Sequence, residues 1–460
     1  MKNLLLDVTG VVVGFLALWT TLRRNAAERT KAIQAAAICL VTAVVVFWTS
    51  LPPDPFEDFR DHYYLAGNAV LDSRAALTPL LNGEVHVNGF VNLPIVAYLW
   101  APFALLPVSI AEGILTAVGV LSIVSAWALI VRLAGLEGNS RWLLLFLFAA
   151  SGPLHNSLRE GNTTHMMLLV LALGLHFLRS GRALSAGLLL GAGAIIKLPL
   201  LLLGAWFLVR RDWRAAAGFG AACGTAGLLS IAVFGWSANE QWFENSVWQY
   251  STQPIGAWNV QSIPAFLVRL VNEPQVLLEF EATRSPGAAQ RLASIVLVGL
   301  LYVIALVVSR VGRRRLLAQP RASAEERREL EYLLVVTLAV VTSPLSWSHY
   351  YTLLLLPIAF LLGSRLRSVR KSRLRWLTWI GIVLTTPAVL IVGTDRLAGD
   401  GPVNAPEKAL LELYAKVAIS HLLYGGLILF AALAWARARA ETEAGATDRT
   451  QAVAPVVVEQ

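Results

Sequence analysis

The stretch "ALSAGLLLGAGAIIKLPLLLLGAWFLVRRDWR" (residues 183–214) sets the expectation for the whole chain. It holds two apolar runs, 183–197 and 199–209, and a basic cluster closes it at 210–214. Runs this long and this evenly apolar are typical of membrane helices, because strands of a membrane barrel alternate apolar and polar residues. Only helices and closed barrels satisfy the backbone hydrogen bonds in lipid. The stretch therefore predicts an α-helical membrane protein.

The rest of the chain repeats this pattern. Of its 460 residues, 56% are hydrophobic and only 15% are charged, which is more apolar than a soluble domain. Residues 4–22 are an additional candidate helix, and 93–107, with three prolines, predict a kinked span or a re-entrant piece. We therefore expect an all-α polytopic membrane protein of about eleven to fourteen helices. The other candidate spans are 32–51, 109–131, 142–154, 164–178, 183–197, 199–209, 215–234, 291–309, 330–345, 351–363, 376–393 and 410–435.

The placement of charge predicts the topology. The formal net charge of +9 comes largely from Lys and Arg in short loops between apolar runs, which is the positive-inside pattern. This distribution predicts membrane lipids as partners and argues against nucleic acid. The chain then divides into an integral-membrane domain, 1–439, and a disordered cytoplasmic tail, 440–460. Two long loops, 52–93 and 235–290, are poor in Lys and Arg and are expected on the outer face of the plasma membrane.

The polar and aromatic residues collect in these two loops rather than in the middle of the helices. The first contains "DPFEDFRDHYYLAGNAVL" (54–71), with four acids beside paired tyrosines, and the second is rich in Trp. A Trp-rich loop is consistent with an aromatic belt at the membrane interface. It is equally consistent with a groove, since aromatic faces stack on sugars and polyisoprenoid chains. A transporter would instead need polar groups inside paired broken helices.

Six motifs in order carry a family resemblance. They resemble the glycosyltransferases of the GT-C fold and, more narrowly, glycosyltransferase family 87, whose members use polyprenyl-phosphate sugars. The resemblance implies an inverting hexosyltransferase that needs neither cofactor nor metal. The motifs are "DFRDHYYLAGNAVL" (58–71), "NLPIVAYLWAPFALLP" (92–107), "LREGNTTHMMLLVLALGL" (158–175), "GLLLGAGAIIKLPLLLL" (187–203), "WNVQSIPAFLVRL" (258–270) and "SPLSWSHYY" (343–351).

The resemblance makes Asp58 the catalytic acid of the first loop. An acceptor hydroxyl has a pKa far above 7, so a carboxylate has to take its proton during the attack. One displacement with inversion needs one such base and no covalent sugar intermediate. The alternative is that Asp58 caps the helix that starts near Arg60. Asp61 is a second acid candidate, or a solvated charge.

Three residues are candidates for binding the donor phosphate, and the resemblance assigns the first of them, Lys197, to it. Lys197, in an apolar run, would stabilise the charge that grows on the leaving phosphate; the alternative is a lysine that snorkels to the interface. His349 would donate a hydrogen bond, or is an ordinary interfacial histidine. Arg269 would clamp phosphate, or only anchors its loop.

A wider set of residues is expected to form the substrate groove. For Asn162 and His165, which start a helix, an ordinary capping role is the alternative. No metal site is expected, because the acids and histidines match no standard ligand spacing. The full set is Tyr63, Tyr64, Trp258, Asn259, Gln261, Ser262, Trp347, Tyr350, Asn162 and His165.

These features together predict a mannosyltransferase. The donor would be a polyprenyl-phosphate monosaccharide, with mannose ahead of arabinofuranose or glucose. The acceptor would be a lipid-linked or cell-envelope glycan on the outer face. A transporter or flippase of lipid-linked sugars is the alternative from another class.

Overall fold

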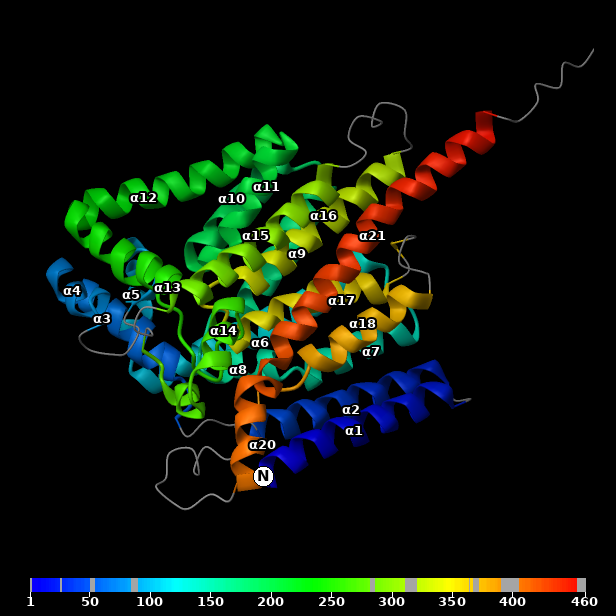
Figure 1. The fold of residues 1–460 in the computed structure, drawn as a ribbon, viewed down its shortest axis with the longest axis horizontal. Helices are drawn as coiled ribbons and strands as arrows, with labels where there is room; N and C mark the ends of the chain where they lie inside the picture. Colours follow the sequence, from blue (N-terminus) through cyan, green and yellow to red (C-terminus); the bar gives the residue numbers. More distant parts are fainter. Residues whose placement is uncertain are drawn as a thin grey trace, which may run out of the picture.

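The structure is a computed structural model of the 460-residue chain. It describes residues 2–24, 27–49, 54–83, 90–281, 286–310, 321–363, 365–366, 372–389 and 405–452. Every regular element in these ranges is a helix, and the only strand-like pairing there is a bridge between Val260 and Trp347. Figure 1 shows most of the long helices running between two ends of the molecule.

Five of the described helices are long and apolar enough to cross a membrane. A sixth crossing follows if α8 (Gly152–Arg159) and α9 (Thr164–Arg179), bent by 116° at a short turn, count as one broken span. The five are α2 (Glu28–Thr49), α6 (Val108–Ala134), α12 (Trp213–Trp242) with its extension to Thr252, α15 (Ala288–Arg310), and the span Lys408–Ala440. The prediction of an all-α polytopic membrane protein is confirmed.

Shorter apolar helices fill in the bundle. The segment expected at 4–22 is helix α1 (Lys2–Arg23), which packs beside α2. Residues 93–107 give only a 3₁₀ turn and the eight-residue α5 (Ala97–Ala104), which is too short to cross a bilayer. The others are α7 (Asn139–Ala150), α10 (Ala183–Ile196), α11 (Leu201–Arg210), α17 (Leu355–Leu362) and α18 (Ser372–Thr385).

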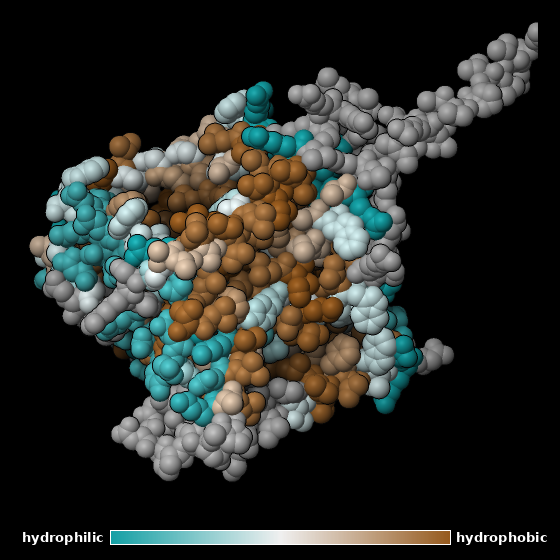
Figure 2. Space-filling model, viewed as in Figure 1, coloured by the Kyte–Doolittle hydropathy of each residue, from teal (hydrophilic) through white to brown (hydrophobic). Residues whose placement is uncertain are grey.

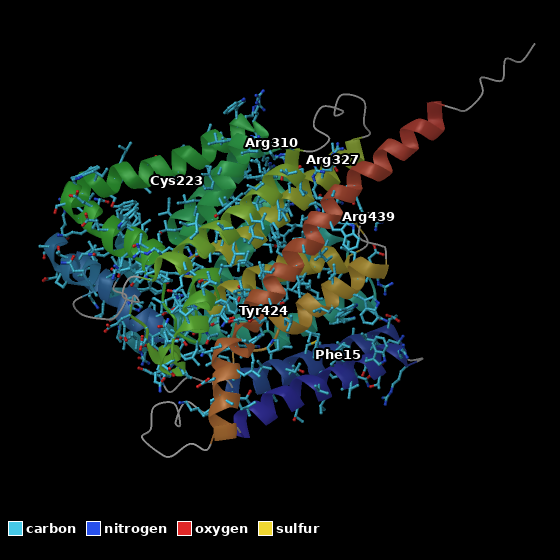
Figure 3. All side chains as sticks on the ribbon, viewed as in Figure 1. Phe15, Cys223, Arg310, Arg327, Tyr424 and Arg439 are labelled. Carbon is cyan, nitrogen blue, oxygen red and sulfur yellow. The ribbon has the colours of Figure 1, made fainter. Side chains whose placement is uncertain are left out.

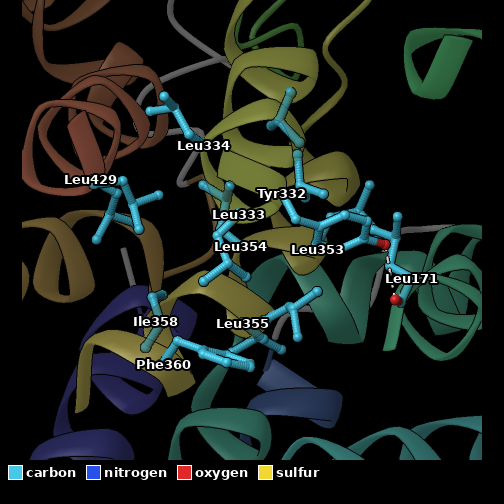
Figure 4. Packing of buried hydrophobic residues seen from close by; sticks show 14 of the residues in the cluster. Leu171, Tyr332, Leu333, Leu334, Leu353, Leu354, Leu355, Ile358, Phe360 and Leu429 are labelled. Carbon is cyan, nitrogen blue, oxygen red and sulfur yellow. Dashed lines mark hydrogen bonds between the residues drawn. The ribbon is translucent and has the colours of Figure 1, made fainter. Parts of the chain in front are cut away.

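The bundle is built around α16 (Arg321–Thr342), which packs against α11, α15, α17 and α21 (His421–Ala452). Figure 4 shows Leu333 and Leu334 of α16 and Leu354, the residue before α17, in the part of the core that faces Leu429 of α21. The buried Tyr332 in this core donates its hydroxyl proton to the Leu171 carbonyl of α9, at 2.9 Å. Helix α21 continues to Ala452, into the segment expected to be a tail, and residues 453–460 lie outside the described part.

The glycine-rich run at 187–193 lets two helices approach closely. A Cβ on Gly187 would lie 2.0 Å from the Ala215 carbonyl oxygen, and one on Gly218 would lie 2.3 Å from the Leu184 oxygen. Helices α10 and α12 are therefore in backbone contact, which only residues without a side chain allow. Lys197 follows the last residue of α10.

The two segments expected as long loops are largely helical. The first contains a π-helical segment η1 (Asp58–Tyr64), α3 (Leu65–Asp72), a 3₁₀ turn and α4 (Thr78–Leu81). In the second, α12 runs on past a kink at Gly235 (φ 79°) into another π-helical segment (Phe243–Trp248) and α13 (Gln249–Thr252). Further on in this segment lie α14 (Ile263–Val271) and a 3₁₀ turn (Pro274–Leu278). Much later in the chain, α20 (Ala405–Lys416) precedes α21.

The two ends of the molecule differ in chemistry. We call the end with η1, α3–α5, α13 and α14 the Asp58 end; it is on the left in Figure 1. In Figure 2 hydrophilic residues gather there, while apolar residues cover much of the middle. Arg310, Arg327 and Arg439, labelled in Figure 3, lie towards the other end, which we call the arginine end. The surface in between includes exposed apolar residues of α15, such as Leu292 and Ile295.

Candidate active site

Asp58 begins the η1 segment and is held by a residue distant in sequence. Its Oδ2 accepts a hydrogen bond of 2.6 Å from Nδ2 of Asn162. The residue before the segment, Glu57, has no side-chain capping bond, and no backbone amide among the described residues donates to Asp58. The structure therefore gives no support to the capping interpretation of Asp58. Its carboxylate is available at one edge of a helix whose apolar side, through Phe59, packs on Trp100 and Phe103.

Asn162 performs two tasks from the turn between α8 and α9. Its Oδ1 accepts from the backbone N–H and the hydroxyl of Thr164, at 3.0 and 2.8 Å, which caps the start of α9. Its amide N–H₂ is then free to donate to Asp58. The Asn162 side chain therefore bonds the first residue of α9 and also contacts Asp58, while its role in the substrate groove stays a prediction.

The same turn is fastened to the first loop by backbone bonds. The N–H of Phe56 donates to the Arg159 carbonyl at 2.6 Å, and that of Phe59 donates to the Glu160 carbonyl at 3.1 Å. Gly161 has φ +65°, and a Cβ there would lie 2.6 Å from Cβ of Phe59, so only glycine fits. These contacts bring the Glu160 carboxyl into the charge environment of Asp58.

Glu160 is not among the residues predicted from the sequence. Burial, and next the negative charge of Asp58, raise its pKa to about 8. No motif links an acid at 160 with one at 58, so its place depends on the tertiary contact. The one local signal is the neighbouring Gly161, which marks a turn beside an acid.

Lys197 ends α10 and points its charge into the same region. The backbone leaves the helix there (φ −129°, ψ 91°) because Pro199 follows. The side chain is 6% exposed, and Nζ lies 4.8 Å from the ring centroid of Tyr350. Among the described residues no carboxylate lies within ion-pair distance of Nζ, and Asp58 provides the negative charge that acts on it. A small cavity with Thr164 and Leu353 in its wall borders the lysine.

His349 and Tyr350 come from a 3₁₀ segment, Ser348–Leu354, that enters this region beside α8 and α9. The His349 side chain is buried, and its Nε2 has no hydrogen-bond partner in the described part of the chain. Its ring lies 5.1 Å from that of Tyr350 and feels the charge of Lys197. The motif "SPLSWSHYY" thus meets the lysine of the motif at 187–203, as the family resemblance implies.

The tyrosines of the first loop have different places. Tyr63 stacks on Trp100, with ring centroids 4.5 Å apart, and feels the negative charge of Asp58. Tyr64 donates its hydroxyl proton to the Leu106 carbonyl at 2.7 Å, which ties the loop to the segment after α5. We therefore place Tyr63 beside the site and give Tyr64 a supporting role.

His165 also has a supporting contact. Its Nδ1 is 2.9 Å from the Ser157 hydroxyl, and a Cβ added to Gly119 would lie 2.5 Å from its Nε2. The ring thus joins α8 and α9 and fills a notch on α6. Its role as a groove residue stays a prediction.

The motif around 258–262 is joined to "SPLSWSHYY" by backbone bonds. The N–H of Gln261 donates to the Ser346 carbonyl at 2.6 Å, and that of Ser348 donates to the Asn259 carbonyl at 2.6 Å. These bonds flank the bridge between Val260 and Trp347. The second loop therefore fixes the segment that carries His349.

The side chains of this motif mostly serve that junction. The amide N–H₂ of Gln261 donates to the carbonyls of Trp258 and Ile419, and the Ser262 hydroxyl donates to that of Pro344. Both side chains are fully buried. Trp258 packs partly against the main core. We find structural contacts for Gln261 and Ser262, while a groove role for Trp258, Asn259 and Trp347 stays a prediction.

Arg269 anchors its loop, which was the alternative to phosphate binding. One guanidinium nitrogen, Nη1, donates to the carbonyls of Gly256, Ala257 and Val260, and Nη2 donates to the Ser420 hydroxyl at 3.0 Å. Burial lowers the pKa of Arg269 to about 10, so it stays charged at neutral pH. Its guanidinium is enclosed by these partners, so we no longer count it among the phosphate ligands.

Asp61 lies on η1 three residues beyond Asp58 and is half-buried. The charge that acts on Lys197 and on Tyr350 is that of Asp58. The part of Asp61 in the chemistry stays a prediction. The described residues contain no group of three or more His, Cys, Asp or Glu side chains arranged to hold a metal ion.

An acid held by an amide, a buried cation and a histidine thus converge from three motifs far apart in the chain. The sequence profile of "Glycosyltransferase family 87" matches residues 90–344, more than half of the chain. The chain belongs to glycosyltransferase family 87. It is therefore a membrane glycosyltransferase, and the family assignment made from the six motifs is confirmed.

Curated relatives cover most of the chain at low identity. One from Mycobacterium tuberculosis, a "polyprenol-phosphate-mannose-dependent alpha-(1-2)-phosphatidylinositol mannoside mannosyltransferase", is 26% identical over 74% of this chain and 78% of its own length. One from Mycolicibacterium smegmatis, named for a phosphatidylinositol pentamannoside, is 27% identical over 76% of this chain and 80% of its own. A second from that organism, with the same name as the first, is 27% identical over 77% and 81%.

Proposed function

We propose that this protein transfers mannose from a polyprenyl-phosphate donor to a glycolipid or cell-envelope glycan on the outer face of the plasma membrane, with inversion. The observation that carries the proposal is the pair formed by Asp58 and Lys197. The acid accepts one hydrogen bond, from Asn162, and the buried lysine has no carboxylate within ion-pair distance among the described residues. A buried charge without an ionic partner is costly unless a ligand provides one.

Asp58 acts as the base in this proposal. It takes the proton from an acceptor hydroxyl as that oxygen attacks the anomeric carbon of the donor sugar. The new bond from oxygen to carbon forms while the bond from the anomeric carbon to the phosphate oxygen breaks. Attack from the face opposite the phosphate inverts the configuration in one step. The Asn162 amide orients the carboxylate for this transfer.

Lys197 stabilises the leaving group. The electron pair of the broken bond stays on the polyprenyl phosphate, which gains a negative charge. A fixed cation in a buried site stabilises that charge without a proton transfer. The neighbouring His349, whose Nε2 lacks a partner among the described residues, donates a hydrogen bond to the same phosphate. These two groups supply the charge stabilisation, so we propose that the reaction needs no metal and no cofactor.

The donor, the acceptor class and the membrane face rest on separate grounds. The printed names of the relatives support polyprenyl-phosphate mannose as the donor and a glycolipid as the acceptor. The arginine end supports an outer-face site, because basic residues favour the cytoplasmic side and α3, which directly follows the segment that Asp58 begins, lies at the other end. Exposed apolar helices beside the site allow a lipid donor to arrive laterally from the bilayer.

The test is a transfer assay with the full-length protein in nanodiscs. Polyprenyl-phosphate mannose, glucose and arabinofuranose are offered with a membrane glycolipid extract, and products are identified by mass spectrometry. We expect transfer of mannose that EDTA leaves unchanged. Asp58→Asn should lower the rate about 10³-fold or more, since general-base catalysis contributes about 10² to 10⁴. Asp72→Asn, a change of the same kind at the end of α3, serves as the control.

Three results would overturn parts of this proposal. If Asp58→Asn retains turnover, Asp58 is not the catalytic base. A product of unchanged anomeric configuration would exclude single displacement. Transfer only from a donor other than the mannose compound would correct the sugar.

A further inference from the structure

Asn92 holds the backbone just before Lys197. Its Nδ2 donates a hydrogen bond of 2.8 Å to the carbonyl oxygen of Ile196, the last residue of α10. The Asn92 side chain is only 4% exposed, so this bond is shielded from water. Asn92 begins "NLPIVAYLWAPFALLP" (92–107), a motif to which the proposed reaction gives no part. The bond thus joins this motif to the one that contains Lys197.

The bond supplies a donor that the end of α10 lacks. The last carbonyls of a helix have no amide partner within that helix. In a continued helix the N–H of Leu200 would donate to the Ile196 carbonyl, but it donates to the Lys197 carbonyl instead, at 2.9 Å. A buried carbonyl without a donor destabilises the fold. The Asn92 amide therefore takes the place of the missing helical partner.

The same bond fixes the peptide unit from which the lysine side chain starts. The carbonyl of Ile196 and the N–H of Lys197 lie in one plane, because the bond between them has partial double-bond character. The N–H donates to the Gly193 carbonyl at 2.9 Å, and the carbonyl accepts from Asn92. Both polar groups of this peptide unit are therefore held. Its orientation sets the position of Cα of Lys197, and with it the point from which the ammonium group reaches into the site.

Asn92 is itself attached to α12. The Trp242 indole N–H donates to the Val91 carbonyl at 3.0 Å, and the Ile95 N–H donates to the Ser230 hydroxyl at 3.3 Å. Both partners belong to α12, which is in backbone contact with α10. Asn92 and the end of α10 are thus mounted on one pair of helices that pack closely.

We propose that Asn92 is a positioning residue that aims Lys197 at the leaving phosphate of the donor. This inference rests on the proposed function, because it takes Lys197 as the group that stabilises that phosphate. It gives the donor side a counterpart of the hydrogen bond from Asn162 to Asp58. Asn92 touches no substrate in this role and acts only through the peptide unit between Ile196 and Lys197.

Binding of a phosphate lipid tests the inference without turnover. The full chain in nanodiscs is titrated with farnesyl phosphate and, as the reference for the lipid part, with farnesol. Lys197→Met should weaken farnesyl phosphate binding about 10- to 100-fold, the range for a hydrogen bond to a charged group. Asn92→Ala should weaken it about fivefold, since a displaced cation interacts less strongly with the phosphate. Neither variant should change farnesol binding.

A double-mutant cycle shows whether Asn92 acts through Lys197. In the Lys197→Met background, Asn92→Ala should change farnesyl phosphate binding less than about twofold, because no cation is left to misplace. Asn92→Leu keeps the size of the side chain without the donor and should behave as Asn92→Ala does. If Asn92→Ala weakens binding by the same factor in both backgrounds, Asn92 does not act through the lysine and the inference is overturned. It is also overturned if folded Asn92→Ala binds farnesyl phosphate as wild type does.

A matched control removes a bond of the same kind elsewhere. Nδ2 of Asn272, the residue that follows α14, donates to the Val268 carbonyl at 2.8 Å. Asn272→Ala should leave farnesyl phosphate binding within about twofold of wild type, because sites without shared partners do not couple. If it weakens binding as much as Asn92→Ala does, the loss is a general effect of removing a donor at a helix end, and the inference fails.

Transfer kinetics distinguish this failure from failure of the proposed function. In the mannose-transfer assay, Asn92→Ala should lower kcat about tenfold, because misplacement of a catalytic group slows the chemical step. The KM for the acceptor should stay unchanged. If wild type transfers no sugar, or Lys197→Met transfers it as fast as wild type does, the proposed function of the site fails. If wild type is active, Lys197→Met is impaired and Asn92→Ala is not, only the role of Asn92 is wrong.

Discussion

The Asp58 end and the arginine end both contain buried charges, but they treat them in opposite ways. At the arginine end each buried carboxylate of α16 has two arginine partners: Glu329 is held by Arg179 and Arg365, and Glu331 by Arg210 and Arg437. These arginines come from α9, α11, α21 and the segment after α17. The clusters therefore fasten the ends of several helices together.

At the Asp58 end Arg60 forms ion pairs with Asp54 and Glu112, but the charges of the site itself are kept apart. Lys197 has an aromatic ring beside it and no carboxylate within ion-pair distance among the described residues, and Glu160 has no hydrogen bond within the described chain. Satisfied ion pairs hold a structure, whereas unsatisfied buried charges lower its stability and persist where a ligand uses them. The comparison thus distinguishes the structural ion pairs of the arginine end from the candidate active site at the Asp58 end. Variants at either end test this distinction.

The largest expected effect is on stability at the arginine end. Glu331→Gln leaves Arg210 and Arg437 facing each other in a buried place, so the free energy of unfolding should fall by about 3–5 kcal/mol. Unfolding in detergent measures it. Glu325→Gln on the same helix is the control, because its contact with Arg365 is long (3.9 Å) and exposed, and it should cost less than about 1 kcal/mol. If the two variants have equal free energies of unfolding, the ion pairs of Glu331 do not stabilise the arginine end as described.

The next effect is on activity at the Asp58 end. Lys197→Met keeps the length of the side chain but removes the cation, so the rate of mannose transfer should fall about 10²-fold or more. Stability should stay the same or rise, because an unpaired buried charge is lost. Lys408→Met, at an exposed lysine of α20, controls for loss of charge alone. A loss of folding with no specific loss of activity would make Lys197 a structural residue.

A smaller effect on activity is expected when Asn162 keeps its hydrogen bonds to Thr164 but loses its hydrogen bond to Asp58. Asn162→Asp keeps the oxygen that caps α9 but removes the donor to Asp58. The kcat should fall by about 10- to 100-fold, the range for a hydrogen bond to a charged group, with little change in donor KM. Asn245→Asp, whose amide contacts lie at 3.4 Å elsewhere at this end, is the matched control. An unchanged kcat would show that Asp58 needs no orienting donor.

The smallest effect concerns pH. Burial and the charge of Asp58 raise the pKa of Glu160 to about 8, while Asp54 and Glu57 add to the rise and Arg159 opposes it. A folded-state pKa above the unfolded value gives stability that is present below the unfolded pKa and is lost as pH rises through about 8. The melting temperature of wild type should therefore fall further between pH 5 and pH 9 than that of Glu160→Gln. The difference between the two decreases should be on the order of 2 °C. Parallel curves for the two proteins would rule out this titration.

The contrast also shows what could be predicted along the chain. The apolar runs gave the helical class, and Lys197 was found because a lysine inside such a run is rare. Asp58 and His349 were found through motifs. Apart from the helix expected near Arg60, the helical content of the two segments expected as long loops was not predicted, since short helices after a kink such as Gly235 have no long apolar period. For Arg269 the sequence left phosphate binding and loop anchoring open, because a buried guanidinium that binds loop carbonyls has no sequence pattern of its own.

The sequence by itself determined the class of the protein, since burying so many apolar residues in helices with basic loops has one stable solution in a membrane. It also determined which three motifs provide the acid, the lysine and the histidine of the candidate active site. Only the tertiary structure decided that Asn162 holds Asp58, that Glu160 stands beside it, and that Lys197 keeps its charge unpaired. The physical reason is that these contacts join residues about a hundred or more positions apart. The chemistry of a side chain follows from the residue itself, whereas contacts between helices depend on how the whole bundle packs.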